Sequence, residues 1–74
     1  IKADSTNAIA HYNLGLCLQK QRRIPDAISA YREAIRLRPD LGDAYNNLGV
    51  CLNEQSALQE AADAFNHALQ LQPD

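Results

Sequence analysis

The chain has 74 residues, of which 46% are hydrophobic and 22% are charged, and its formal net charge at pH 7 is −2. A chain of this length makes one small domain at most, whose core usually supplies only about 3 to 5 kcal/mol of net stability. No apolar run approaches the roughly 18 residues that span a bilayer, so we expect no membrane-spanning segment.

The first predicted helix follows residues 1–7. Thr6 or Asn7 is expected to cap it, because short polar side chains accept hydrogen bonds from the first free backbone N–H groups of a helix. Residues that face one side recur at helical spacing: Ala10, Leu14, Cys17, Leu18 and Gln21. We expect this stripe to face the core.

The second predicted helix carries a longer apolar stripe. Its members recur at i, i+3, i+4, i+7, i+10 and i+11: Ile24, Ala27, Ile28, Tyr31, Ala34 and Ile35. Pro25 falls in the first turn of this helix, where a missing N–H breaks no helical hydrogen bond. Pro39 is expected to end the helix.

The same pattern returns 34 residues later. It predicts a third helix on Ala44, Leu48, Cys51 and Leu52, and a fourth on Leu58, Ala61, Ala62, Phe65, Ala68 and Leu69. When residues 8–40 are aligned with residues 42–74, 13 of the 33 pairs are identical, where chance would give roughly two. The sequence therefore predicts an all-α chain of two antiparallel helix pairs, residues 8–41 and 42–74.

Residues 1–7 continue the same register backwards, with Ile1 at the place of Ile35 and Leu69. We expect them to be the tail of a preceding repeat, and the chain to be a piece of a longer array.

Two glycines lie inside predicted helices at equivalent places. Gly15 and Gly49 each cost the helix about 0.5 to 1 kcal/mol relative to alanine. Without a Cβ, each allows the second helix of its pair to approach closely, and we expect these contacts near Tyr31 and Phe65.

Cys17 and Cys51 also occupy equivalent places, on helices expected to be parallel neighbours. Stacked helices lie about 8 to 10 Å apart, whereas a disulfide needs Cα atoms within roughly 7 Å. We expect two free thiols that act as small core residues rather than metal ligands or redox groups.

The repeated unit resembles the tetratricopeptide repeat. The residues that carry the resemblance are Leu14, Gly15, Ala27, Tyr31, Ala34 and Pro39 in the first unit, and Leu48, Gly49, Ala61, Phe65, Ala68 and Pro73 in the second. The resemblance implies a right-handed α-α superhelix, or solenoid, of two helix-turn-helix repeats.

The chain departs from this family at three places. The family favours a large aromatic residue three positions before the leucine, which Tyr45 matches and His11 does not. It also favours glycine in the turn inside each pair, where this chain has Arg22 and Ser56. A left-handed backbone there would be strained by on the order of 1 kcal/mol.

No motif for catalysis or cofactor binding is present in the sequence. It has no glycine-rich phosphate loop, no nucleophile elbow and no pair of histidines or cysteines at metal-ligand spacing. We expect no enzyme activity, no cofactor and no metal. The basic residues are expected to be a solvated surface, without nucleic-acid binding: Lys20, Arg22, Arg23, Arg32, Arg36 and Arg38.

One further face of each first helix remains, and in the resembled family it lines a concave groove that holds peptides. The candidate residues are Ile9, Tyr12, Asn13, Leu16, Lys20, Asp43, Asn46, Asn47, Val50 and Asn53. Lys20 is the only cation expected in this groove. Chaperone adaptors of the family grip a terminal carboxylate with a lysine and an asparagine, but those places hold Tyr12 and Leu16 here, which disfavours that mode.

A second mode resembles the repeats of the O-linked N-acetylglucosamine transferase, where an asparagine before each motif leucine binds peptide backbone. Asn13 and Asn47 match that pattern. We therefore expect a protein-interaction module that holds extended peptides. Two alternatives stay open: a scaffold element that stacks on copies of itself, and the substrate-binding arm of a glycosyltransferase whose catalytic domain lies outside this chain. The sequence leaves the compartment open.

The charge distribution bears on the scaffold alternative. Residues 1–38 carry seven basic and three acidic side chains, and residues 39–74 carry no basic and six acidic ones. Such asymmetry promotes end-to-end association, although a solvated surface without a partner would also explain it.

Overall fold

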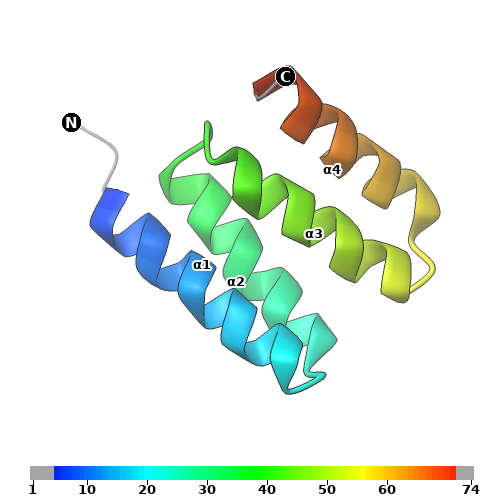
Figure 1. Ribbon diagram of the computed structural model, residues 1–74, viewed down its shortest axis with the longest axis horizontal. Coiled ribbons are helices and arrows are strands. Elements are labelled where there is room, and N and C mark those ends of the chain that lie inside the picture. Colours follow the sequence, from blue (N-terminus) through cyan, green and yellow to red (C-terminus); the bar gives the residue numbers. More distant parts are fainter. Residues whose placement is uncertain (1–4, 72–74) are drawn as a thin grey trace.

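The computed structural model describes residues 5–71, which form four α-helices (Figure 1). α1 (Ser5–Lys20) and α2 (Ile24–Leu37) make one antiparallel pair, and α3 (Gly42–Glu54) and α4 (Leu58–Leu71) make the other. Figure 1 shows α1 and α3 running in the same direction, and α2 packs against both. The predicted all-α architecture of two helix-turn-helix repeats is confirmed.

The start of α1 differs from the prediction. Because the helix begins at Ser5, Thr6 and Asn7 lie inside its first turn, and the prediction that one of them caps the helix is wrong. Residues 1–4 of the predicted tail lie outside the described residues. The boundaries at residues 7, 41 and 74 stay predictions.

Each helix pair is joined by a tight turn with one left-handed residue. Arg22 has φ 63° and so does Ser56, at the place where the family favours glycine. Around Arg22, the Arg22 N–H donates to the Gln19 carbonyl at 3.0 Å and the Arg23 N–H donates to the Leu18 carbonyl at 2.9 Å. These bonds satisfy the last carbonyls of α1 in the manner of a Schellman cap, and the equivalent pair forms around Ser56.

Close helix contact explains both glycines. A Cβ built on Gly15 would lie 2.5 Å from Cε1 of Tyr31, and one built on Gly49 would lie 2.8 Å from Cε1 of Phe65. Real Cβ atoms do not approach ring carbons this closely. The predicted approach near Tyr31 and Phe65 is confirmed.

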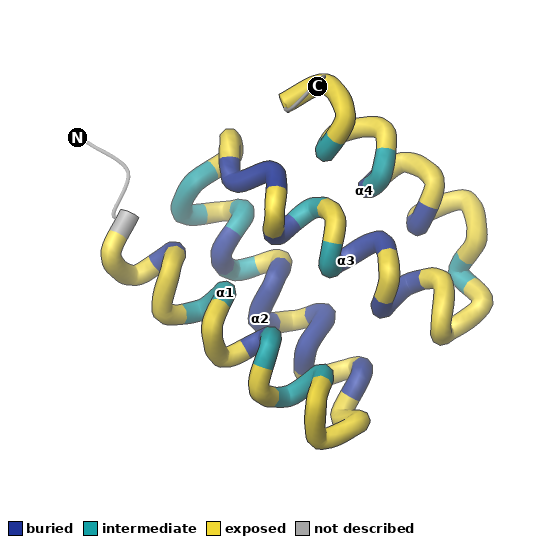
Figure 2. The backbone as a smooth tube through the Cα atoms, in the orientation of Figure 1, coloured by how far each residue is buried: buried dark blue, intermediate teal, exposed yellow. Residues whose placement is uncertain are grey.

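The core lies between α2 and α3, with α4 closing one side. Figure 2 shows the buried positions concentrated on α2 and α3, while α1 and α4 are largely exposed. One cluster joins residues of the two repeats: Ile24, Ala27, Ile28, Tyr31, Leu48, Cys51, Leu52, Ala61 and Ala64. Tyr31 and Cys51 are the largest fully buried side chains of the described part of the chain.

The predicted core stripe of the first helix is mostly wrong. Leu14 is 48% exposed, Ala10, Cys17 and Gln21 are exposed, and Leu18 is half-buried. The equivalents of Ala10, Leu14, Cys17 and Leu18 on α3 are buried because α2 covers them, whereas no described helix covers this side of α1. Gln55, the equivalent of Gln21, is itself exposed. The fourth helix is similarly open at Leu58 and Leu69, which are 65% and 62% exposed.

Candidate functional site

The candidate groove residues all lie on α1 and α3, the two helices that run in parallel. Most are exposed: Ile9, Asn13, Lys20, Asp43, Asn46, Val50 and Asn53. Three are half-buried: Tyr12, Leu16 and Asn47. We call this surface the groove face. Its half-buried members join the groove face to the core beneath it.

Tyr12 links the two repeats at the centre of the groove face. Its hydroxyl accepts a hydrogen bond from the Asn47 side-chain amide at 3.1 Å. Its ring lies 5.9 Å from the ring of Tyr31, at an interplanar angle of 50°. Tyr12 therefore packs partly into the core and orients Asn47, rather than only lining the groove as the sequence suggested.

An open cleft of about 400 Å³ lies beside this bond. Leu16, Lys20 and Asn47 line it together with Gln19 and Arg22. The first three were predicted, whereas the other seven candidates do not line this cleft.

Two cleft residues were missed from the sequence. Gln19 follows Leu16 by three residues, so helical spacing places it on the same side of α1. The Tyr31 hydroxyl donates to its Oε1 at 2.6 Å, which fixes the Gln19 side chain. Arg22 belongs to the turn, where helical periodicity carries no information.

Arg22 changes the electrostatics of the cleft. The prediction that Lys20 is its only cation is wrong, because Arg22 also lines it. Arg22 Nη2 lies 2.8 Å from Glu54 Oε1, however, so its charge is largely balanced. No described carboxylate forms an ion pair with Lys20, which leaves that ammonium as the unbalanced charge of the cleft.

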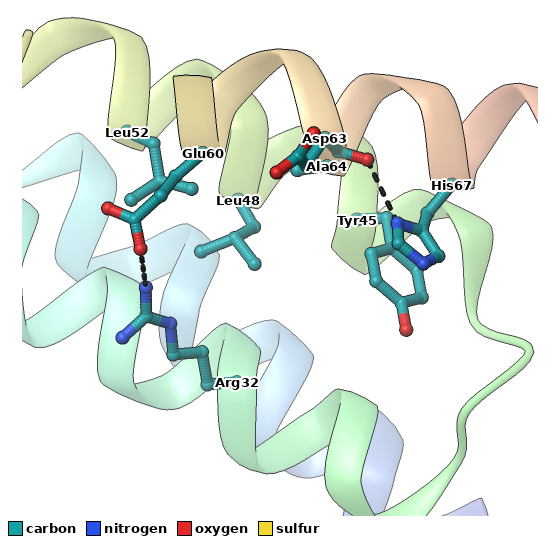
Figure 3. A pocket seen from close by; sticks show the side chains of 8 residues that line it. All are labelled: Arg32, Tyr45, Leu48, Leu52, Glu60, Asp63, Ala64 and His67. Atoms are coloured by element: carbon teal, nitrogen blue, oxygen red, sulfur yellow. Dashed lines mark hydrogen bonds and ion pairs between the residues drawn. The ribbon is translucent and has the colours of Figure 1, made fainter. Parts of the chain in front are cut away.

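A second cleft, of about 220 Å³, opens on the outer side between α2, α3 and α4 (Figure 3). Leu48 lies in its middle, and at one end Tyr45 and His67 stack with ring centres 5.0 Å apart. At the other end Arg32 and Glu60 form an ion pair at 3.5 Å.

Several polar groups of this outer cleft already have partners within the chain. Besides the Arg32–Glu60 pair, Nδ1 of His67 is 2.9 Å from the backbone oxygen of Asp63. The groove-face cleft is larger and keeps an unbalanced cation, so it is the better candidate for binding.

All five arginines lie in ion pairs. Besides Arg22 and Arg32, the partners are Arg23 with Asp26, Arg36 with Glu33, and Arg38 with Asp40. Hydrogen bonding to Arg36 lowers the pKa of the Glu33 carboxyl below its ordinary value. The arginines are thus paired surface residues, and Arg22 is the one that also lines the groove-face cleft.

The two thiols are free and differ in environment. Cys17 is exposed and Cys51 is buried, so the prediction of a small core residue holds only for Cys51. Burial raises the pKa of the Cys51 thiol, and the nearby Glu54 raises it further. Cys17 is therefore the thiol open to reagents.

Within residues 5–71, no group of three or more metal-ligating side chains gathers at one place. None of the described helices is both long and apolar enough to cross a bilayer.

Comparison with known proteins bears on the repeat architecture. No curated protein matches the chain. A profile described as tetratricopeptide repeat matches residues 1–41 and 18–74, which together span the whole chain. With the glycine contacts and paired helices described above, this match shows that the chain belongs to the tetratricopeptide repeat family.

Proposed function

We propose that the chain is a protein-interaction module that holds extended peptide segments against its groove face through the side-chain amides of Asn13 and Asn47. Tetratricopeptide repeats generally act in protein–protein interaction. The observation that carries the finer proposal is the half-buried Asn47 amide, oriented by Tyr12 at the edge of an open cleft.

The amide chemistry suits peptide backbone. An asparagine side chain offers two N–H donors and a carbonyl acceptor, and the bond to Tyr12 engages one of the donors. A second donor and the acceptor can pair with a peptide C=O and N–H. Asn13 is the equivalent residue one repeat earlier and is exposed on the same face.

The spacing of the two asparagines fits an extended ligand. Equivalent points on neighbouring parallel helices are separated by about 10 Å, which is roughly three residues of extended chain at 3.3 Å each. Each hydrogen bond contributes only about 0.5 to 1.5 kcal/mol net, and the peptide loses conformational freedom on binding. Two repeats should therefore bind a peptide at roughly millimolar affinity.

Lys20 adds a preference for acidic side chains, because it is the unbalanced charge of the cleft. This preference should be small and should fall with added salt, since the ammonium is solvent-exposed.

Peptide titration by NMR tests the proposal. The probes are an uncharged, threonine- and valine-rich peptide and the same peptide with one aspartate. Asn13→Ala and Asn47→Ala should each weaken both peptides about 2- to 10-fold, whereas Lys20→Ala should weaken only the acidic one. Asn66→Ala, which removes an exposed asparagine of α4, is the control and should change neither affinity.

Tyr12→Phe separates orientation of Asn47 from direct contact with the peptide. If Tyr12 acts by holding Asn47, its loss should weaken binding in the native chain but not in the Asn47→Ala variant. Unchanged affinity in the Asn13→Ala/Asn47→Ala double variant would remove the backbone-binding mechanism.

A further inference from the structure

The two ends of the helix stack expose surfaces that resemble the buried junction between the repeats. We call the exposed residues Ala10, Leu14, Cys17 and the half-buried Leu18 of α1 the leading face. Those at the same places on α3 are identical and buried: Ala44 at 0%, Leu48 at 7%, Cys51 at 0% and Leu52 at 5% exposure. The leading face therefore already has the chemistry of an interface.

At the opposite end of the stack, α4 exposes a surface equivalent to the side of α2 that packs against α3. We call Leu58, Ala62, Phe65 and Leu69 of α4 the trailing face. They occupy the places of Ile24, Ile28, Tyr31 and Ile35 on α2, which pack in one cluster with Leu48, Cys51 and Leu52. Leu58 is 65% exposed whereas Ile24 is 7% exposed.

We propose that the leading face of one copy docks on the trailing face of a second copy, as α3 docks on α2 within the chain. The occupant of each face is thus another copy of this protein, and the junction continues the established α2–α3 interface. Because the two faces differ, such a contact is heterologous and adds copies in an open head-to-tail row.

Charge favours the head-to-tail order over a contact between two like faces. Within the chain, Arg22–Glu54 and Arg32–Glu60 join the basic first repeat to the acidic second repeat. A head-to-tail row again brings a basic first repeat beside an acidic second one, whereas two leading faces together would bring two basic repeats into contact.

The junction between copies should be weaker than the one inside the chain. Both cross-repeat ion pairs are lost, since Ser56 and Asn66 stand at the places of Arg22 and Arg32. Ala62 is also smaller than the Ile28 it replaces and buries less apolar area. We therefore expect association near millimolar protein, weakened by salt through the remaining charge asymmetry.

The reactivity of the Cys17 thiol measures whether the junction between copies has formed. In the row Cys17 takes the place of Cys51, which is fully buried. Its alkylation by iodoacetamide should slow about 1.5- to 3-fold between about 10 μM and about 1 mM protein at low salt. Sedimentation with a reductant present should show the average mass rising over the same range. The Cys51→Ala variant, measured in parallel, shows that the signal comes from Cys17.

Two complementary variants test the head-to-tail order. Leu14→Gln blocks the leading face and Leu69→Gln blocks the trailing face, and both residues are about half or more exposed. Each variant alone should stay monomeric, and an equal mixture should form a dimer with one junction. Gln70→Ala, on the exposed side of α4, is the control and should associate like the unmodified chain.

A chain that stays monomeric at about 1 mM in low salt, with unchanged Cys17 alkylation, would overturn the proposal and leave the end faces to a different occupant. Association of the unmodified chain without rescue in the mixture would overturn the head-to-tail order. Alkylation and sedimentation are measured without peptide, so their results test association between copies independently of peptide binding to the groove face.

Discussion

Replacing the same leucine at equivalent places in the two repeats tests how the helices pack. Leu48 and Leu14 are both the motif leucine of their repeat, but Leu48 is 7% exposed and Leu14 is 48% exposed. Leu48→Ala should leave a cavity between α2 and α3 and lower the free energy of unfolding by about 2 to 5 kcal/mol.

Leu14→Ala should have a smaller effect. Complete burial of a leucine is worth about 1.5 to 3 kcal/mol, and about half of Leu14 is already exposed, so its truncation should lower the free energy of unfolding by about 1 kcal/mol or less. No closed cavity forms, because solvent reaches the site.

Urea unfolding followed by circular dichroism measures both effects, in dilute protein so that association does not contribute. Since a core of this size supplies only about 3 to 5 kcal/mol, Leu48→Ala should be largely unfolded without a stabilising osmolyte, whereas Leu14→Ala should keep a full transition. Equal losses in the two variants, or a fully helical Leu48→Ala chain at room temperature, would refute the packing described for the two repeats.

The equivalent glycines give a second matched pair of substitutions. Gly15→Ala should destabilise the chain by roughly 1 to 2 kcal/mol, because Tyr31 is fully buried and cannot move aside. Gly49→Ala should be nearly neutral, because Phe65 is half-buried and its ring can shift. The reverse order in thermal melts would contradict this. A third prediction concerns alkaline pH. Burial raises the pKa values of the Cys51 thiol and the Tyr31 hydroxyl, so the folded chain favours their neutral forms. This stabilisation is complete below the ordinary pKa values of about 8.5 and 10, and it is lost as pH rises through the raised pKa values. The melting midpoint should fall between about pH 8.5 and 11, less steeply in Tyr31→Phe, and a midpoint independent of pH would refute the assignment.

The fold could be predicted because the repeat carries its own geometric markers. A glycine inside a helix is unfavourable unless a neighbour occupies the space of its Cβ, and Gly15 and Gly49 identified the helix contacts correctly. Arg22 and Ser56 adopt the left-handed backbone at the place where the family has glycine.

Burial at the ends of the stack could not be predicted from the apolar stripes. Leu14 and Leu48 have the same helical spacing and the same motif neighbours, yet only Leu48 has a helix against it. A stripe indicates which side of a helix can pack, but not whether another helix covers that side.

The candidate site could be predicted only as a face. Helical spacing assigned Leu16, Lys20 and Asn47 to the groove side, and these three do line one cleft. The contribution of Arg22 depends on the turn and on Glu54 of the next repeat, and neither has a periodic signal. The Tyr12–Asn47 bond depends on the distance between helices, which is a property of the packed structure.

Mapping of a bound peptide by NMR chemical shifts tests whether Asn13 and Asn47 on the groove face bind the peptide backbone. In the labelled chain, the uncharged extended peptide should shift the backbone and side-chain amide signals of Asn13 and Asn47, together with signals of their neighbours on α1 and α3. Signals on the outer sides of α2 and α4 should stay in place. Shifts confined to the outer cleft around Tyr45 and His67, or to the leading and trailing faces, would show that the peptide binds elsewhere on the molecule.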